Sequence, residues 1–174
     1  MAIPKRHSPN ERQFQSSRTF FVTTSTAARR RFFQVERHAD LLLKTLYEYR
    51  DSARFQLHEF CIMPDHVHLL LTISPGMTIE KALQLIKGGF AFRAGKEFGA
   101  NGTIWQRGFS EMRIFELEGF HARKHYIRQN AVQTSRHSGG ISFLLRLPWV
   151  RAGSSPGEPQ GLKPTPAWEL FRHG

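Results

Sequence analysis

The chain has 174 residues, 40% of them hydrophobic, and a formal charge of +11 from 25 Lys and Arg against 14 Asp and Glu. This composition excludes a disordered chain, and the single cysteine, Cys61, excludes an internal disulfide. The positive charge favours a polyanionic partner, most commonly nucleic acid, although a basic protein without such a partner stays open.

Composition divides the chain into three segments. We expect a flexible, polar lead-in over residues 1–15, a folded domain over 16–135, and an atypical extension rich in Pro and Gly over 136–174. The N-terminus lacks the apolar stretch of a secretory signal, and no segment reaches the roughly 18 apolar residues of a membrane span. We therefore expect a cytoplasmic, nucleoid-associated protein that does not bind a membrane.

The first half of the folded domain predicts a strand, a helix and a hairpin. RTFFVTTST at 18–26 is rich in β-branched and aromatic residues, which is typical of a strand. A helix is predicted over 35–51, where apolar residues recur at helical spacing. The residues of this stripe are Val35, Ala39, Leu42, Leu43, Leu46 and Tyr49. Strands are predicted at 54–63 and 66–73, with Pro64-Asp65 as the turn of a hairpin between them.

The second half predicts a helix, an extended segment and another helix. The first helix begins near Thr78, a plausible N-cap, and Gly88-Gly89 within it indicates a kink or a close backbone approach. Its expected buried face consists of Ile79, Leu83, Ile86 and Phe90. Short extended segments are predicted within 103–115 and a helix over 116–129. This order of elements favours an α+β fold, with helices packed on an antiparallel sheet.

Two histidines open the predicted strand at 66–73. His66 and His68 alternate with Val67, so they project from the same face of the strand, within reach of one ion. Imidazole nitrogens bind divalent metals well, and a strand holds two of them in a fixed orientation. His-x-His also arises often by chance in a chain with nine His. The pair is therefore either ordinary packing or half of a metal site that needs a third ligand.

RKHYIRQNAV at 123–132 contains the candidate partner residues. On a helix, Tyr126 and Asn130 are four residues apart and share a face, while Ile127 is expected to face the core. The Asn130 side chain can offer a carbonyl oxygen as the third ligand, with Gln129 in reserve, and Tyr126 presents a phenol toward the same ion. The alternative is a tyrosine that only packs.

MPDHVHLLL at 63–71, followed about sixty residues later by YIRQN at 126–130, resembles the HUH-type single-tyrosine transposases of bacterial insertion sequences. The similarity is greatest to the REP-associated tyrosine transposases. IKGGFAFR at 86–93 and IWQRGFSE at 104–111 also resemble that family, so the likeness covers about residues 16–132. It implies a ferredoxin-like α+β domain, with the histidines on a central strand and the tyrosine on a nearby helix.

The resemblance also implies a role for each candidate site residue. His66 and His68 would be the HUH metal ligands, Asn130 would complete the coordination, and Tyr126 would be the nucleophile. It implies Mg²⁺ or Mn²⁺, whereas ligand preference alone would suit Zn²⁺, Mn²⁺ or Fe²⁺, because Mg²⁺ prefers oxygen ligands. The expected substrate is single-stranded DNA bearing a REP-type hairpin, nicked through a 5′-phosphotyrosine intermediate and rejoined by a 3′-hydroxyl.

The basic and aromatic residues around these motifs are the expected DNA contacts. Unpaired bases are expected to stack on Trp105, Phe109 and Phe92. Phosphates are expected to contact Arg29-Arg30-Arg31, Lys87, Arg93, Arg107, Arg113, Arg123, Lys124 and Arg128.

Three matters stay open from the sequence. The proton acceptor for Tyr126 is His121, His125 or water, and relatives of the family include both monomers and homodimers that share sites. A decayed relative that binds hairpin DNA without cleaving it is the first competing hypothesis, favoured by Glu111-Met112, where the family commonly carries an acidic residue followed by His. A zinc hydrolase unrelated to DNA is the second.

Overall fold

The computed structural model describes residues 17–137, with side chains described as far as residue 130. The predicted lead-in at 1–15 and nearly all of the predicted extension at 136–174 lie outside the described residues. The elements, in chain order, are β1 (Arg18–Ser25), the short 3₁₀ helices η2 (Ala27–Arg29) and η3 (Phe32–Gln34), α1 (Glu36–Asp51), β2 (Phe55–Ile62), β3 (His66–Ile73), α2 (Ile79–Phe98), β4 (Ser110–Ile114) and α3 (Leu117–His137).

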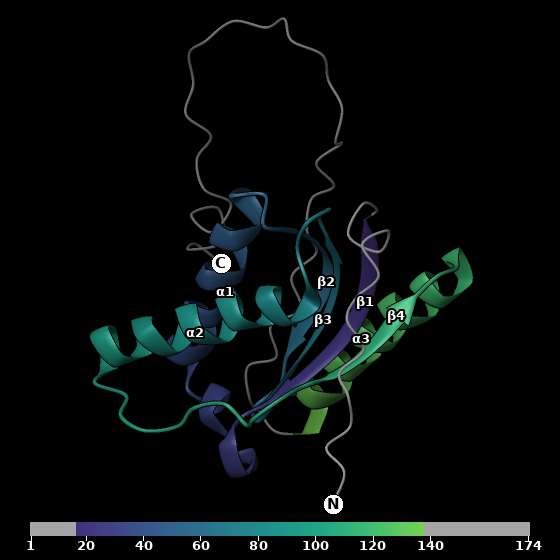
Figure 1. Cartoon of the computed structure of the whole chain (residues 1–174). Coiled ribbons are helices and arrows are strands. Elements are labelled where there is room, and N and C mark those ends of the chain that lie inside the picture. The colour runs from purple at the N-terminus through teal and green to yellow at the C-terminus, as the bar shows by residue number, and fades with distance from the viewer. Residues whose placement is uncertain (1–16, 138–174) are drawn as a thin grey trace, which may run out of the picture.

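The four strands form one antiparallel sheet in the order β2-β3-β1-β4. Strands β2 and β3 pair directly, as predicted for a hairpin. Strand β1 lies in the middle of the sheet, beside β3. Helices α1 and α2 cover one face of the sheet, and α3 crosses the other (Figure 1). The predicted ferredoxin-like α+β fold is thus confirmed.

The main core lies between the sheet and the α1–α2 layer. Alternate residues of β1 point into it, which is why its burial pattern alternates along the whole strand. The predicted apolar face of α2 is fully buried, and so is most of the predicted stripe on α1. Tyr49 is partly buried, whereas Val35 precedes α1 and is 45% exposed, so its assignment to the helical stripe was wrong.

Gly89 allows α1 and α2 to approach each other closely. A Cβ added at Gly89 would collide with the Tyr49 side chain of α1, whereas the same atom at Gly88 would meet open space. The close approach predicted for this glycine pair is therefore confirmed at one of its two positions. The Thr78 side chain accepts a hydrogen bond from the Lys81 backbone N–H at 3.1 Å and caps α2 as predicted.

A second and much smaller core lies under α3. Cys61, Leu70 and Ile127 are fully buried there, so the predicted inward orientation of Ile127 is confirmed. Beside this cluster, the Arg128 guanidinium of α3 donates to the Glu59 carboxylate of β2, through Nε at 3.0 Å and Nη2 at 2.9 Å. Apolar packing and an ion pair therefore hold α3 on the sheet.

The predicted extended stretch at 103–115 is a strand only in its second half. Its first half is a loop, fixed to the end of β1 by an isolated bridge between Thr26 and Trp105. This loop brings Gln106 beside the end of β1, where its backbone N–H donates to the Ser25 carbonyl oxygen. None of the helices within residues 17–137 is both long enough and apolar enough to cross a membrane.

Candidate functional site

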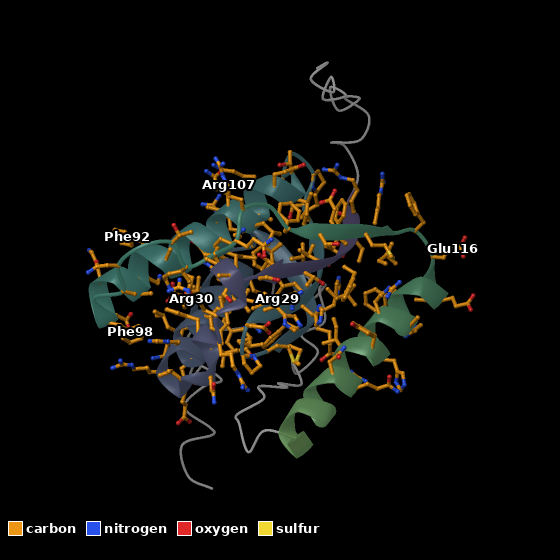
Figure 2. The ribbon with its side chains drawn as sticks, turned by 90° about the horizontal axis from the view of Figure 1, so that it is seen from below. Arg29, Arg30, Phe92, Phe98, Arg107 and Glu116 are labelled. Atoms are coloured by element: carbon orange, nitrogen blue, oxygen red, sulfur yellow. The ribbon has the colours of Figure 1, made fainter. Side chains whose placement is uncertain are left out.

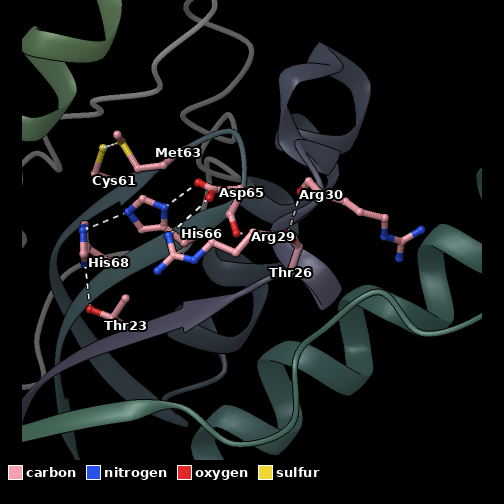
Figure 3. Close-up of polar contacts among 9 residues, drawn as sticks. All are labelled: Thr23, Thr26, Arg29, Arg30, Cys61, Met63, Asp65, His66 and His68. Carbon is pink, nitrogen blue, oxygen red and sulfur yellow. Dashed lines mark hydrogen bonds and ion pairs between the residues drawn. The ribbon is translucent and has the colours of Figure 1, made fainter.

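The two histidines predicted as ligands lie side by side on β3, on the face of the sheet that α3 crosses. Their Nε2 atoms are 3.2 Å apart and face each other, as Figure 3 shows. His68 is 6% exposed, whereas His66 sits closer to solvent at the end of the strand next to the hairpin turn. Period-two alternation sends Val67, between them, into the main core as predicted.

Each histidine is oriented by a second side chain through its other ring nitrogen. His66 Nδ1 is 2.7 Å from Asp65 Oδ1, and His68 Nδ1 is 2.8 Å from the Thr23 hydroxyl on β1. Partners of this kind fix the tautomer and the orientation of metal-binding imidazoles. Sequence reasoning assigned Asp65 to the turn alone and gave Thr23 no role. Their signals were the position directly before His66 and the outward face of β1.

Burial decides the protonation state of the inner histidine. Desolvation, and to a smaller extent the charge of His66, lowers the pKa of His68 to about 4. His68 is therefore neutral at physiological pH, with a lone pair free to bind a cation. Burial alone would raise the pKa of Asp65, but the hydrogen bonds and charges of His66 and Arg29 outweigh it and lower that pKa, which keeps the carboxylate ionised.

The geometry of the pair fits a divalent ion. An ion bound by two imidazole nitrogens at about 2.1 Å, with an angle of about 90–110° between the bonds, sets those nitrogens about 3.0–3.4 Å apart. The observed 3.2 Å between the two Nε2 atoms lies within this range. Within the described residues, no three His, Cys, Asp or Glu side chains cluster closely enough to hold an ion. A further ligand of another type is therefore needed.

Tyr126 lies against the histidine pair within the same chain. The centre of its ring is 5.5 Å from that of His68, in an edge-on arrangement, and 5.8 Å from that of Phe21 on β1. Phe21 stacks in turn on His68 at 5.5 Å, so the three rings form one group. The Tyr126 side chain is 41% exposed, which leaves it accessible from solvent.

The predicted third ligand, Asn130, is one helical turn from Tyr126. Its side-chain amide nitrogen donates to the Tyr126 carbonyl oxygen at 3.0 Å, along its own helix. The reserve candidate, Gln129, donates through its own amide to His125 Nε2 at 2.8 Å. The role of Asn130 in coordination stays a prediction, and His125, one of the suggested proton acceptors, is engaged by its neighbour on α3.

The predicted DNA-binding cations do not lie on one surface. Arg123 lies on the side of the site near Tyr126: its guanidinium lies 5.3 Å from the centre of the Phe21 ring and donates to Met112 Sδ. Lys124, one residue later on α3, places its ammonium 6.0 Å from the Phe120 ring. Arg113 of β4 lies opposite buried Phe20, which places it on the other face of the sheet from the histidines.

Three other predicted DNA contacts have partners within the protein. The guanidinium of Arg128 is paired with Glu59, and that of Arg93 with Glu48 of α1. The Lys87 ammonium donates to the backbone oxygens of Gln106 and Gly108, and burial lowers its pKa. These contacts give the three residues structural roles, which do not require DNA.

The predicted stacking role of Trp105 is corrected by its burial. Trp105 is 7% exposed, packs against Phe33 and Phe90, and donates from its indole N–H to the Lys87 carbonyl oxygen at 3.1 Å. Its ring faces are therefore covered by the core and unavailable to a base. Phe92 is exposed, but it lies on α2 far from α3, as Figure 2 shows.

Comparison with known proteins places the chain beside transposases. The family model described as IS200-like transposase matches residues 15–130. Solved structures with a similar fold include a REP-associated tyrosine transposase bound to a REP hairpin, at 20% identity and a TM-score of 0.58, covering 76% of this chain and 74% of that one. Another is a candidate transposase from Deinococcus radiodurans, at 23% identity and a TM-score of 0.51, covering 75% and 97%. No curated protein matches the chain.

Proposed function

We propose, because the chain belongs to the IS200-like transposase family, that it nicks and rejoins single-stranded DNA bearing a hairpin, with Tyr126 as the nucleophile. The observation that carries this proposal is the 5.5 Å approach of the Tyr126 ring to His68. The hydroxyl-bearing residue and the candidate ion ligands meet within one chain. The proposal therefore does not require a homodimer to complete the site.

The reaction exchanges one phosphate ester for another. The Tyr126 hydroxyl oxygen forms a bond to phosphorus, the bond from phosphorus to the 3′-oxygen breaks, and that oxygen leaves as a 3′-hydroxyl after taking up a proton. The phenolic proton passes to a nearby acceptor, because a phenol with a pKa near 10 is almost wholly protonated at neutral pH. Attack by a 3′-hydroxyl on the 5′-phosphotyrosine reverses these steps and joins two strands.

The two imidazoles fit a divalent ion, and the family resemblance favours Mg²⁺ or Mn²⁺. His66, His68 and, as a prediction, Asn130 would hold it, and the bound ion would polarise the scissile phosphate and neutralise developing charge. Asp65 keeps the His66 ring fixed with Nε2 toward the site. Thr23 does the same for His68 from the neighbouring strand. The two orienting contacts reduce the motion of the ligands when the phosphate arrives.

A hairpin substrate is supported by charge and by likeness. A net charge of +11 favours a polyanion, and Arg123 places a cation beside Phe21, which itself touches Tyr126. The solved REP-associated relative is bound to a REP hairpin, and we extend that class of substrate to this chain.

The test is a comparison of two tyrosine variants, Tyr126→Phe and Tyr47→Phe. Each protein is incubated with labelled hairpin oligonucleotides and Mg²⁺ or Mn²⁺, and adducts are separated on a denaturing gel. The wild type should form a covalent protein–DNA adduct. Tyr47→Phe, which removes a hydroxyl from α1, should also form it. Tyr126→Phe should form none while binding the hairpin with nearly unchanged affinity. An adduct that survives Tyr126→Phe would refute the assignment.

The same experiment separates the competing functions. A protein that binds hairpins without cleaving them is the second candidate, because Glu111-Met112 stands where the family commonly carries an acidic residue followed by His. Salt-sensitive hairpin affinity with no adduct from the wild type under either metal would support that candidate. Tight Zn²⁺ binding without DNA affinity would instead favour a hydrolase that does not act on DNA.

A further inference from the structure

An open groove of about 400 Å³ runs beside the histidine pair, between the end of β1 and the loop that precedes β4. Its lining includes Arg29, Arg107, Phe109 and Ser110. We propose that this groove binds one unpaired nucleotide of the DNA strand, with its phosphate at Arg29 and Arg107 and its base on Phe109. This inference rests on the proposed function and names the part of the substrate that the groove takes.

The groove and the candidate site share their walls. Thr23 lines the groove and also bonds His68, and Arg29 lines it while its Nη1 lies 3.3 Å from Asp65 Oδ2. Asp65 in turn holds His66 through its other oxygen. Figure 3 shows this continuous series of contacts from Thr23 to Arg29. A nucleotide in the groove therefore lies directly beside the phosphate that the histidine pair would face.

The loop side of the groove is fixed before any ligand arrives. The Gln106 backbone N–H donates to the Ser25 carbonyl oxygen at 2.9 Å, which ties the loop to β1. From α2, the Lys87 ammonium donates to the Gln106 and Gly108 carbonyl oxygens at 2.8 and 2.9 Å. A binding wall held from two elements loses little entropy on binding.

The opposite side contains the most unusual backbone of this region. Ala28 and Arg29 are consecutive non-glycine residues with positive φ, 53° and 52°. Such a conformation costs about 1–2 kcal/mol per residue and persists only where surrounding contacts enforce it. Here the Thr26 hydroxyl contacts the carbonyl oxygens of Arg30 and Asp65 at 2.6 and 3.0 Å. The result is a rigid turn that carries Arg29 to the rim of the groove.

The chemistry of the groove matches a nucleotide better than it matches duplex DNA. Arg29 is 66% exposed in its side chain and bonds Asp65 through Nη1, which leaves guanidinium donors directed to solvent. A phosphate oxygen can accept from these donors, and Arg107 adds a second cation. A base in a duplex has both faces covered by its neighbours, so only an unpaired base can stack on Phe109.

The experiment scans the phosphates that flank a hairpin. In the Tyr126→Phe background, which prevents cleavage, affinity is measured for oligonucleotides with one neutral methylphosphonate linkage placed at each unpaired position in turn. When the groove residues are unchanged, the methylphosphonate at one of these positions should weaken binding about tenfold. Arg29→Gln or Arg107→Gln should weaken binding of the unmodified oligonucleotide and abolish the extra loss at that linkage. In a second scan, an abasic site replaces each unpaired base in turn. The loss of one base should weaken binding to the protein with native Phe109, and Phe109→Leu should abolish that extra loss.

The matched control is Arg54→Gln, which removes the same charge from an exposed position outside the groove. It should keep the full sensitivity to that linkage. Undiminished sensitivity in both Arg29→Gln and Arg107→Gln would overturn the nucleotide site while leaving hairpin binding intact. A protein without affinity for any hairpin would instead refute the proposed function, and the groove proposal with it. Because Arg107 lies on an exposed loop, its variant keeps the test valid if Arg29→Gln fails to fold.

Discussion

The two faces of the sheet are packed in very different ways. The face under α1 and α2 buries a large, continuous apolar cluster built from both helices and from strands β1, β2 and β3. On the face under α3, the apolar cluster among the described residues consists of Cys61, Leu70 and Ile127, with a few partly buried neighbours. Polar side chains fill the rest of it, including the histidine pair. One face provides stability, and the other leaves room for a site on a rigid support.

The difference between the two faces follows from the alternation of side chains along β3. Along β3, Val67, Leu69 and Leu71 point into the main core, while His66 and His68 point toward α3. A strand buried on one side tolerates polar residues on the other because the first side fixes its register. The candidate ligands therefore owe their fixed positions to residues that never contact the substrate.

Truncating two adjacent leucines should show the largest difference between the faces. Leu69 and Leu70 are both fully buried but point to opposite sides of the sheet. Leu69→Ala leaves a cavity in the main core and should lower the free energy of unfolding by about 4 kcal/mol. Leu70→Ala should cost about 2 kcal/mol, because α3 can settle into the smaller space. Urea denaturation of both variants measures the difference.

The same two variants should show the opposite order in their effect on adduct formation. Leu70 packs with Ile127, the residue next to Tyr126, so Leu70→Ala should slow adduct formation more than Leu69→Ala does at a temperature where both variants are folded. If the two variants lose the same stability and the same adduct yield, the two faces do not differ in the way described.

Breaking one ion pair on each side should give an intermediate effect. Arg128 pairs with Glu59, which is 2% exposed, across the α3 face, whereas Arg93 pairs with half-exposed Glu48 across α1 and α2. Arg128→Met leaves a buried carboxylate without its partner and should cost about 2 kcal/mol, reduced from the usual value because water reaches this guanidinium. Arg93→Met should cost less than about 1 kcal/mol. Thermal unfolding compares the two variants.

A double variant tests whether the unpaired carboxylate causes the loss of stability. Adding Glu59→Leu to Arg128→Met removes the unpaired carboxylate and should restore much of the lost stability. If Arg128→Met alone is as stable as the wild type, the Glu59 pair does not hold α3 on the sheet.

Much of the fold could be predicted because its signals are local. The helical stripe of α1, the hairpin turn at Pro64-Asp65 and the Thr78 cap depend on residues near one another in the sequence. The His-x-His alternation predicted a shared face for the same reason. The approach of Tyr126 to His68 joins two motifs distant in the chain, and only the family resemblance linked them beforehand.

What could not be predicted depends on contacts between distant segments. Trp105 stands in a basic, aromatic stretch typical of nucleic-acid binding, yet the bridge to Thr26 turns it into the core. Thr23 orients His68 only because β1 and β3 pair in one particular register. Arg128 has the sequence features of a DNA contact, and its pairing depends on Glu59, far away along the chain. Charge alone does not distinguish a surface cation from a structural one.

The smallest expected effect concerns the pH dependence of the α3 face. His58 Nε2 lies 2.7 Å from the Thr72 hydroxyl, and its ring contacts Phe120 of α3. Burial, and then the charge of Lys124, lowers the pKa of His58 below its ordinary 6.5. Between the lowered pKa and 6.5 the unfolded chain binds more protons at this position than the folded chain does. The free energy of unfolding therefore rises with pH across this interval.

The contribution of His58 to stability is thus fully present above pH 6.5 and is lost as the pH falls through the lowered value. His58→Gln, which keeps a hydrogen-bonding side chain without a titrating ring, should flatten the change in unfolding free energy between pH 7 and pH 5. The size of this change should be smaller than the loss expected for Arg128→Met. Urea denaturation with a chelator present measures it. The control is His38→Gln, whose histidine lies on α1, between Phe32 and Phe98 on the other side of the sheet. If His58→Gln retains the full slope of the wild type, protonation of His58 is not what weakens the α3 face in acid. His68, with its pKa near 4 in the same layer, would then be the next residue to test.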